Sequence, residues 1–595
     1  MSVYDDIEIG KVIECAADFV SIEVLGKQKF EDYKLNLQVG KYLKISSGPM
    51  KFIIVNIQSL SHQEYQIETG KTESRFLIRA QPVGTLSDIN KFYRGVTTLP
   101  TPLESVYLVS EENLQDIFSP TANFNFPFGK LSQTSDIQLH IDANNFFSKH
   151  IAVVGSTGSG KSCTVAKILQ KIVGIEKGVN TNQDNPNNCH VLIFDLHSEY
   201  KSAFELGEDS FFDLTILSET NLSLPYWLMN ADELESMFID PNDVSAHDQR
   251  AQFRNAVILN KERHNPSVRD VTYDTPIYFD INEVRYYMEN LNNEVIGKLD
   301  WENQPKLEDG TLVMDRKKIY FDKIHIFSHT STDEATKAVP GPFHGEFDKF
   351  ILNLNTKITD KRLNFLFNPL KQDGTPYQSE DFEVIIKQFL GYFNKSNVTI
   401  VDLSGIPSEV LTITVSLVSR LVFDFCFHIS KLKHFRDLLN DVPVMIVCEE
   451  AHNYAPRIDE IKHLASKKSL EKIVKEGRKY GLSMMVVSQR PSDVSETIFA
   501  QCNNFISLRL NNKEDQEYIK SLLSDISSSI ADSLPNLAPG EFMITGDAVL
   551  MPCIARVNKP NPEPQSQSVK FFDEWRKEWK KIEFDDVIRR WRKEM

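Results

Sequence analysis

One loop in this chain restricts the possible fold more than any other segment. Residues 155–162, Gly-Ser-Thr-Gly-Ser-Gly-Lys-Ser, match the pattern G-x-x-x-x-G-K-[ST] in full. The apolar run Ile151-Ala-Val-Val precedes the loop and a helical stretch from Thr164 follows it, as a phosphate-binding loop requires. Glycines let backbone N–H groups curl around phosphate oxygens at a helix N-terminus. The loop therefore predicts a nucleotide site on an α/β sheet.

The same loop predicts which atoms hold the nucleotide and its cation. We expect ATP and Mg²⁺ as cofactors, with Lys161 reaching the β- and γ-phosphates and the Ser162 hydroxyl ligating Mg²⁺. The residues expected to bind the nucleotide are Gly155, Ser156, Thr157, Gly158, Ser159, Gly160, Lys161 and Ser162.

Apolar strands alternate with helical stretches beyond residue 145. The apolar runs begin at Ile151, Val191, Val398, Val444 and Ser483. Near-continuous apolar strands of this kind indicate a parallel sheet that helices cover on both faces. The second and third runs lie roughly two hundred residues apart, far more than one crossover connection needs. Residues 225–390, rich in charged helical patterns, are therefore predicted to form a mostly helical insertion.

The composition changes along the 595 residues, a length that suggests roughly two to four domains. Short β-forming runs punctuated by glycines predict a small barrel or sandwich at the start of the chain. The predicted segments are a β-barrel at 1–110, the first part of the ATPase core with the P-loop at 111–224, the insertion at 225–390, the second part of the core at 391–557, and a linker with a helical tail at 558–595.

Three of the apolar runs end in an acid, at Asp195, Asp402 and Glu449. Hydrolysis needs one carboxylate near the metal and a second group that orients the attacking water. Only Glu449 is followed by another acid, Glu450, so we assign Glu449 to Mg²⁺ and Glu450 to the water. Asp195 and Asp402 then lie at strand ends of the same sheet, where they can support the site from behind.

The strand that follows the paired acids supplies two more candidates. Gln489 stands at its tip, where an amide can sense the γ-phosphate; the alternative is a plain turn residue. An arginine would neutralise charge in the transition state, and the core offers Arg478, Arg490 and Arg509. Arg478 is favoured because a helix stops there, just before the strand that carries Gln489. The alternative for Arg478 is a surface ion pair.

The charge balance argues against a protein that coats DNA. Lys and Arg number 66 and Asp and Glu 83, so the net charge is −17, whereas a DNA-coating protein is normally basic. DNA binding would need a locally basic groove or pore. One basic run is either a solvated helix face or a surface that faces DNA or another subunit. It consists of Lys462, His463, Lys467, Lys468, Lys472 and Lys475.

No segment of the sequence predicts export or membrane insertion. The N-terminus lacks the basic and apolar regions of a signal peptide, and no run of about 18 apolar residues occurs. The seven cysteines include no C-x-x-C pair, which argues against a zinc site or a disulfide scaffold. We expect a cytoplasmic protein with no membrane partner.

The end of the chain differs from the core in composition. Residues 558–568 read as a linker, and Trp575, Trp579 and Trp591 follow it. Trp575 and Trp579 are four residues apart and would share one face of a helix. This helix either packs on its own domain, or braces a neighbouring subunit or docks a partner.

These motifs together resemble the HerA branch of the HerA/FtsK ATPases. The run Glu449-Glu-Ala-His-Asn-Tyr-Ala-Pro456, with the segments at Gly477 and Gln489 after it, is more specific than the P-loop. The resemblance covers most of the chain and implies a RecA-like P-loop core with an N-terminal HAS-type barrel. Its motifs are residues 126–131, 194–200, 401–405, 446–456, 476–481, 488–491 and 539–542.

The resemblance also implies a mode of action. Members of this family form hexameric rings that hydrolyse ATP at subunit interfaces and pump duplex DNA through the pore. It implies that Arg478 acts on a neighbour's nucleotide, while Lys149 stands where relatives often carry a second arginine. A separate nuclease such as NurA, or another effector in anti-phage systems, would be the protein partner. Two other hypotheses are a protein-remodelling or secretion-type ring ATPase and a nucleotide-dependent scaffold for an effector.

Overall fold

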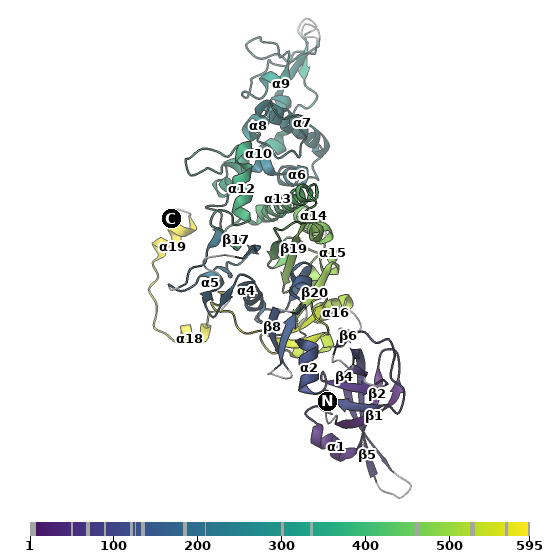
Figure 1. The fold of residues 1–595 in the computed structure, drawn as a ribbon. Helices are drawn as coiled ribbons and strands as arrows, with labels where there is room; N and C mark the ends of the chain where they lie inside the picture. Colours follow the sequence, from purple (N-terminus) through teal and green to yellow (C-terminus); the bar gives the residue numbers. More distant parts are fainter. Residues whose placement is uncertain are drawn as a thin grey trace.

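Three parts follow one another along a single long axis in the computed structural model (Figure 1). A β-barrel with the N-terminus lies at one end, a large sheet lies in the middle, and a helical region lies at the other end; the C-terminus lies beside the sheet. The structure describes residues 7–48, 51–66, 72–87, 91–119, 123–124, 126–132, 137–181, 187–208, 210–298, 303–333, 337–458, 463–523, 530–565 and 569–592.

The N-terminal part is a closed barrel, as the sequence predicts. Its strands run in the order β2-β1-β7-β3-β4-β5-β6, and a further pairing of β2 with β5 closes the sheet on itself. Closure pairs the edges that an open sheet would expose. The elements are β1 (Glu8–Cys15), β2 (Val20–Val24), α1 (Gly26–Tyr33), β3 (Tyr42–Ser46), β4 (Phe52–Gln66), β5 (Thr72–Leu86), β6 (Phe92–Arg94) and β7 (Ser105–Leu108).

The central sheet has eleven strands in the order β14-β17-β13-β18-β19-β10-β20-β21-β22-β8-β9. The strands from β14 to β20 pair in parallel, and those from β20 to β9 pair antiparallel. The strands are β8 (Phe126–Leu131), β9 (Gln138–Ile141), β10 (His150–Val154), β13 (His190–Asp195), β14 (Leu214–Leu217), β17 (Val398–Asp402), β18 (Val444–Cys448), β19 (Leu482–Ser488), β20 (Cys502–Leu508), β21 (Glu541–Gly546) and β22 (Cys553–Arg556).

The prediction of a parallel sheet is therefore correct for the strands from β14 to β20. It omits the antiparallel strands at the other edge of the sheet. The five apolar runs predicted as strands correspond to β10, β13, β17, β18 and β19. The antiparallel extension was not predicted, because β8, β9, β21 and β22 are short and come from both sides of the P-loop in sequence.

Helices cover both faces of the parallel strands, and the strand residues alternate between two cores. On β13, Leu192 and Phe194 pack with α13 (Ser408–His434), whereas Val191 and Ile193 pack with α4 (Lys161–Ile172) on the other face. The further helices of this part are α2 (Glu111–Phe118), α3 (Ala143–Phe147), α5 (Lys201–Phe204), α14 (Leu464–Glu476), α15 (Glu496–Ala500) and α16 (Lys513–Leu522).

Helix α13 is unusually long and apolar. By length and composition its 27 residues could cross a membrane, but 72% of its most apolar window is buried inside the protein. The helix would be about 40 Å long, against about 17 Å for the five residues of β17. Packing as a core helix therefore explains its composition, and its last turns extend beyond the amino-terminal ends of the strands.

The insertion is mostly helical, as predicted, and its apolar side chains join the core on the α13 face. A buried ion pair, Arg420 to Glu233 at 2.9 Å, links α13 to the first insertion helix. The elements are α6 (Ala231–Phe238), α7 (Ala246–His264), α8 (Ile281–Asn293), β15 (Val295–Gly297), α9 (Arg316–Ile319), β16 (Ala338–Pro340), α10 (Asp348–Thr359), α11 (Asn364–Phe367) and α12 (Phe382–Phe389). The boundaries at 110, 224, 390 and 557 remain predictions.

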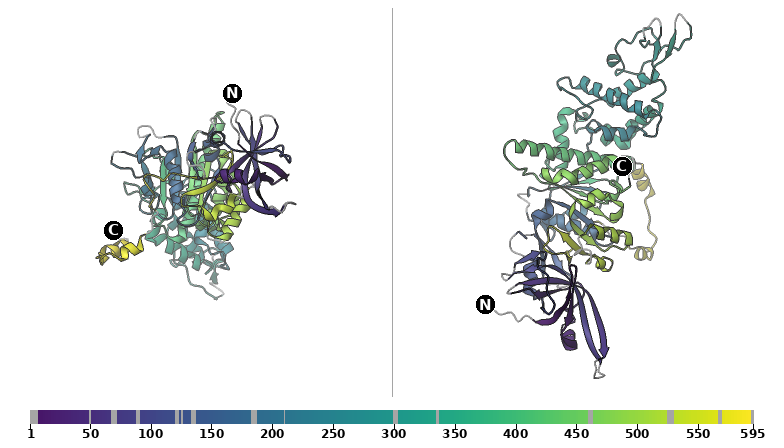
Figure 2. Two further views of the ribbon diagram at one scale, coloured as in Figure 1. Left: turned by 90° about the horizontal axis from the view of Figure 1, so that it is seen from below. Right: turned by 90° about the vertical axis from the view of Figure 1, so that its right-hand side faces the viewer.

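The C-terminal tail lies beside the core (Figure 2). It forms α18 (Phe571–Trp575) and α19 (Phe584–Trp591), and neither helix has a buried residue. The expectation that Trp575 and Trp579 share a helix face is wrong, since α18 ends at Trp575 and Trp579 is 98% exposed. Lys577 and Lys580, which follow the helix, both pair with the Glu574 carboxylate.

Candidate nucleotide site

The P-loop joins β10 to α4 in a conformation that needs glycine at two positions. A Cβ at Gly155 would stand 2.6 Å from Ser159 Oγ and 2.8 Å from Leu508 Cβ, and Gly160 has φ +103°. Two backbone hydrogen bonds hold the loop from outside: Ser156 donates to the Arg509 carbonyl at 2.8 Å, and Gly540 donates to the Ser159 carbonyl at 3.0 Å. Contacts with neighbouring parts of the chain therefore hold the loop in shape.

The predicted site residues gather at the carboxyl edge of the parallel strands. Strand β10 pairs with β19, so Val154 before the loop is in register with Ser488 before Gln489. Strand β13 pairs with β18, so Phe194 before Asp195 is in register with Cys448 before Glu449. Parallel strands place their carboxyl ends at one edge, where open α/β sheets bind their ligands.

Glu449 is a buried carboxylate with an oxygen that lacks a partner. It is 3% exposed, and its Oε2 atom makes no hydrogen bond within the described residues. Burial, and then the charges of Asp195 and Glu199, raise the pKa of Glu449 to about 10. A cation at this position would offset that cost and satisfy the free oxygen.

Glu450 is held in a strained backbone conformation beside the P-loop. Its φ of +47° lies in the left-handed region, which a non-glycine residue adopts only where its surroundings enforce it. Its Oε2 accepts the Gln489 N–H at 3.3 Å and lies 3.4 Å from His452 Nδ1. Burial lowers the pKa of His452 despite the nearby carboxylate. Glu450 thus lies between the Gln489 N–H and the His452 ring, and its charge also acts on Lys161.

Gln489 contacts the P-loop directly. The Thr157 hydroxyl donates to Gln489 Oε1 at 2.6 Å. The amide that the sequence placed at the strand tip thus lies at the phosphate-binding loop, between Thr157 and Glu450. This contact puts the predicted sensor where it can respond to a bound phosphate; its role stays a prediction.

The end of the P-loop reaches an acid that the sequence reasoning left without a role. The Ser162 hydroxyl donates to Glu199 Oε2 at 2.7 Å. Burial lowers the pKa of the Lys161 ammonium, and the charges of Glu450, Glu449 and Glu199 oppose that shift. Glu199 lies within the motif at residues 194–200, so the sequence contains a signal for it. The search for acids at strand ends does not find it, because no strand ends at Glu199.

The two remaining strand-end acids hold backbone and hydroxyl groups. Asp195 is fully buried and accepts the N–H groups of Glu199 at 3.1 Å and Tyr200 at 2.9 Å. Asp402 accepts the Ser198 hydroxyl at 2.7 Å. Both therefore shape the turn that carries Glu199, in the supporting position that the sequence suggested.

The donor set fits a nucleotide with Mg²⁺. Hydroxyl and carboxylate oxygens are the ligands that Mg²⁺ prefers, and the free Glu449 oxygen and the Ser162 hydroxyl supply them. Within the described residues, no group of three or more His, Cys, Asp or Glu side chains could hold a metal ion by itself.

Arg478 lies at the opposite edge of the sheet. It belongs to the short helix η6 (Gly477–Tyr480) that precedes β19, whereas Gln489 follows that strand. The seven residues of β19 span about 23 Å, so Arg478 cannot reach its own P-loop. The side chain is exposed and makes no hydrogen bond or ion pair in the part of the chain that the structure describes.

The other cations near the sheet have partners or face elsewhere. Arg490 pairs with Asp493 at 3.4 Å, and Lys149 pairs with Asp547 at 2.7 Å. Arg509 lies at the P-loop edge, where its backbone carbonyl accepts the Ser156 N–H. Arg509 Nε has no hydrogen-bond partner among the described residues.

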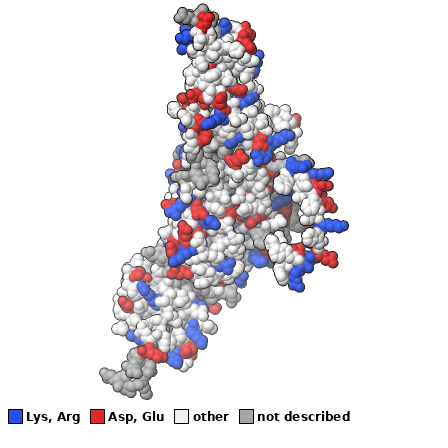
Figure 3. Space-filling model, turned by 180° about the vertical axis from the view of Figure 1, so that it is seen from behind, with Lys and Arg blue, Asp and Glu red and all other residues white. Residues whose placement is uncertain are grey.

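The basic run of α14 is balanced by acids of the same chain. Lys468 pairs with Asp232 at 3.0 Å and Lys475 with Glu471 at 3.2 Å. Lys472 lies 3.9 Å from Asp424, and Lys467 donates to the Arg457 carbonyl. Lys462 lies outside the described residues. On the face shown in Figure 3, basic and acidic side chains are likewise interspersed along the molecule.

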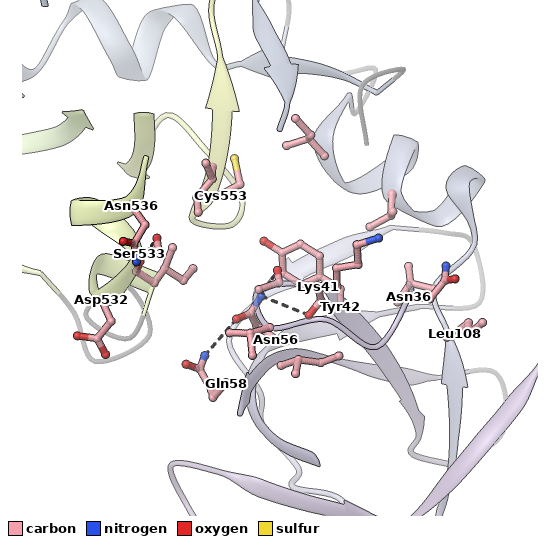
Figure 4. Close-up of a pocket in the computed structure, with 18 of the residues that line it drawn as sticks. Asn36, Lys41, Tyr42, Asn56, Gln58, Leu108, Asp532, Ser533, Asn536 and Cys553 are labelled. Carbon is pink, nitrogen blue, oxygen red and sulfur yellow. Dashed lines mark hydrogen bonds between the residues drawn. The ribbon is translucent and has the colours of Figure 1, made fainter. Parts of the chain in front are cut away.

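A separate cavity of about 370 Å³ lies between the barrel and the core (Figure 4). Tyr42 and Asn56 line it from the barrel, and Asn536 and Cys553 line it from the core. The Tyr42 hydroxyl donates to the Pro552 carbonyl at 3.1 Å across this junction. None of the predicted site residues lines the cavity, so it is distinct from the P-loop site.

The chain is similar to one family of proteins across most of its length. Residues 126–422 match the family described as helicase HerA, central domain. A protein of Methanocaldococcus jannaschii named as a probable helicase is 24% identical over 571 residues, with 92% of each chain covered. The DNA double-strand break repair helicase HerA of Pyrococcus furiosus is 24% identical over 472 residues, with 76% of this chain and 72% of the relative covered.

Solved structures show a more distant likeness. VirB4 of Thermoanaerobacter pseudethanolicus aligns with a TM-score of 0.43 at 13% identity, covering 74% of this chain and 97% of that one.

Proposed function

The chain belongs to the HerA-like ATPases, and from that membership and the geometry of the site we propose that it is a cytoplasmic homo-hexameric ring motor that couples ATP hydrolysis to movement along duplex DNA. The name of the Pyrococcus furiosus relative, which refers to DNA double-strand break repair, supports duplex DNA as the substrate in the pore.

In this proposal the carboxyl edge performs hydrolysis. The P-loop and Lys161 hold the phosphates, while Ser162 and Glu449 hold Mg²⁺, which neutralises charge on the phosphate oxygens. Glu450 accepts a proton from the attacking water and is aimed by the Gln489 N–H. Gln489, already in contact with Thr157, senses the γ-phosphate.

One observation supports the ring: Arg478 and the P-loop lie at opposite edges of the same sheet. Arg478 is exposed, makes no hydrogen bond or ion pair with any described residue and cannot reach its own nucleotide, so it is positioned to enter the site of a second copy. The carboxylates around Lys161 would receive it with favourable charge. ATP hydrolysis then takes place between subunits, and each subunit supplies one edge.

The end of the chain offers a surface for a neighbouring subunit or a partner. Trp575, Trp579 and Trp591 are exposed on the tail, which fits bracing of a neighbouring subunit or docking of a partner better than packing on its own domain. We propose that a separate nuclease or other effector, in DNA processing or anti-phage defence, is the protein partner.

A second candidate is a ring ATPase that moves protein, or a scaffold that organises an effector. Two observations favour this candidate over a protein that binds DNA through this surface. Acids pair with Lys468, Lys472 and Lys475, and the net charge is −17.

The ATPase rate with and without duplex DNA, on protein of known oligomeric mass, separates the candidates. A DNA motor is expected to hydrolyse ATP several times faster with duplex DNA, as a particle of six chains. An unchanged rate would contradict DNA translocation and favour the protein-moving motor or the scaffold.

A further inference from the structure

The hydrogen bond between Ser162 and Glu199 determines which way the hydroxyl of the expected Mg²⁺ ligand points. A serine hydroxyl has one hydrogen to donate and two lone pairs. Here the hydrogen is directed at Glu199 Oε2, 2.7 Å away. Both lone pairs are therefore left for the other side of the oxygen, where a cation can use them.

Glu199 is itself held in place by its backbone from two directions. Its N–H donates to the buried Asp195 carboxylate at 3.1 Å, which ties it to the end of β13. Its carbonyl accepts the Gln565 N–H at 2.8 Å, from the segment that leads to the C-terminal tail. The preceding residue, Ser198, has φ +55° and donates to Asp402 at 2.7 Å. A turn fixed at so many points presents the Glu199 carboxylate in a defined position.

The segment around Gln565 is anchored on the P-loop helix. Gln170 of α4 is fully buried; its Nε2 donates to the Pro562 carbonyl at 2.8 Å, and its Oε1 accepts the Asn561 N–H at 3.1 Å. Ser202 donates to the Glu563 carbonyl at 2.9 Å. The helix that begins with Lys161 and Ser162 thus carries, further along, the segment that holds Glu199.

We propose that Glu199 is a positioning residue for the cation: it accepts the Ser162 proton and so directs the Ser162 lone pairs at Mg²⁺. This inference rests on the proposed role of Ser162 as a Mg²⁺ ligand. Glu449, with its unpartnered buried oxygen, is then the carboxylate that faces the cation, and Glu199 acts through Ser162. In this arrangement Ser162 and Glu449 would hold Mg²⁺, and Glu199 keeps Ser162 oriented for it.

The test is nucleotide binding with and without Mg²⁺, which needs neither DNA nor hydrolysis. A fluorescent ADP analogue is titrated onto the full-length protein in EDTA and then at rising Mg²⁺. Loss of a group that orients a metal ligand weakens metal affinity about 10–100-fold. In Glu199→Ala, the Mg²⁺ concentration that gives half of the Mg²⁺-dependent change in affinity for the ADP analogue should rise by that factor. Binding of the analogue in EDTA should stay as in the wild type.

Two further variants keep the inference open to contradiction. Glu199→Gln retains an acceptor oxygen and should fall between the wild type and Glu199→Ala. Glu205→Gln, which alters an exposed acid of the same region paired with Lys201, should bind Mg²⁺ as the wild type does. Thermal melting of each variant confirms that the fold is intact.

An unchanged Mg²⁺ midpoint in Glu199→Ala would overturn the proposal. So would an equal loss of binding in EDTA and in Mg²⁺, because that would give Glu199 a purely structural role. If the wild type shows Mg²⁺-dependent binding but no stimulation by DNA, the motor proposal fails while the role of Glu199 stands. If the wild type shows no Mg²⁺ dependence, both proposals fail.

Discussion

Charged side chains at the two edges of the parallel strands differ in burial and in hydrogen bonding. At the carboxyl edge, buried acids crowd around Lys161, and hydrogen bonds link the P-loop to Gln489 and Glu199. At the amino edge, Arg478 is exposed and unpaired within the described residues. The carboxyl edge therefore forms a pocket with an excess of negative charge, whereas the amino edge presents the Arg478 cation outside any pocket.

The amino edge also carries an exposed apolar patch. The last turn of α13 and the loop after it expose four large apolar side chains, Leu432, Phe435, Leu438 and Leu439, with exposures from 54% at Leu438 to 90% at Leu439. Asn440 Nδ2 donates to the Tyr480 carbonyl at 2.7 Å, which ties this loop to the helix that carries Arg478. Large exposed apolar patches mark interaction sites. Each edge thus lacks what the other supplies, as expected if two copies share a site.

The largest effect is expected at the amino edge. Arg478→Ala should lower ATP turnover by about 10³–10⁵, the usual contribution of an arginine that neutralises transition-state charge. Steady-state ATPase assays measure the loss, and binding of a fluorescent nucleotide should remain, because the variant's own pocket is intact. Arg269→Ala, which changes an exposed arginine of the insertion, serves as the control. Turnover near the wild-type value would remove Arg478 from the site and leave Arg509 as the candidate.

At the carboxyl edge, Glu450→Gln should lower turnover by about 10²–10⁴, the range for a positioned acid or base, while ATP still binds. The substitution keeps the size of the side chain and removes its charge. Glu496→Gln, an exposed acid paired with Arg457, provides a matched control. Near-normal turnover in Glu450→Gln would be inconsistent with its role and would move the base to Asp195 or Asp402.

A substitution in the apolar patch tests whether the amino edge contacts another copy of the chain. Burying a large apolar side chain contributes about 1.5–3 kcal/mol, so Phe435→Asp should raise the concentration needed for half-assembly at least about tenfold. Mass photometry or sedimentation follows the assembly. Leu352→Asp changes an exposed leucine of the insertion and should leave assembly unchanged. Equal behaviour of both variants would place the subunit interface elsewhere.

The smallest effect is expected on α14. Reversing Lys467 and Lys468 to Glu should leave the slope of log DNA affinity against log salt nearly unchanged, because these lysines already have partners in the same chain. Each lost phosphate contact would make the slope shallower by roughly 0.9. A change of that size would show that the run contacts DNA and that its ion pairs open on binding.

The parts of the site that sequence could predict are those whose chemistry is local. The P-loop and the pair Glu449–Glu450 follow from neighbouring residues at the end of an apolar strand. Arg478 could be placed because the order helix, arginine, strand, Gln489 determines opposite edges. Glu199 lies within the motif at residues 194–200, but that motif does not reveal the hydrogen bond to Ser162 on which its proposed role depends.

For the fold, too, the sequence predicts only what local patterns determine. Continuous apolar runs predict the parallel strands, because burial on both faces leaves that pattern in the sequence. The antiparallel strands β8, β9, β21 and β22 are short and joined across long stretches of chain, so no local pattern indicates their pairing. The spacing of Trp575 and Trp579 predicts a shared helix face, whereas α18 ends at Trp575.

Mixing two inactive variants tests most directly whether the two edges form one site between subunits. Lys161→Ala damages a subunit's own pocket, and Arg478→Ala damages only what that subunit offers its neighbour. After subunit exchange, some interfaces combine an intact lysine from one variant with an intact arginine from the other. The account predicts that ATPase activity returns in the mixture and is absent from either variant alone. If mass measurement confirms exchange and no mixing ratio restores hydrolysis, the shared site is contradicted.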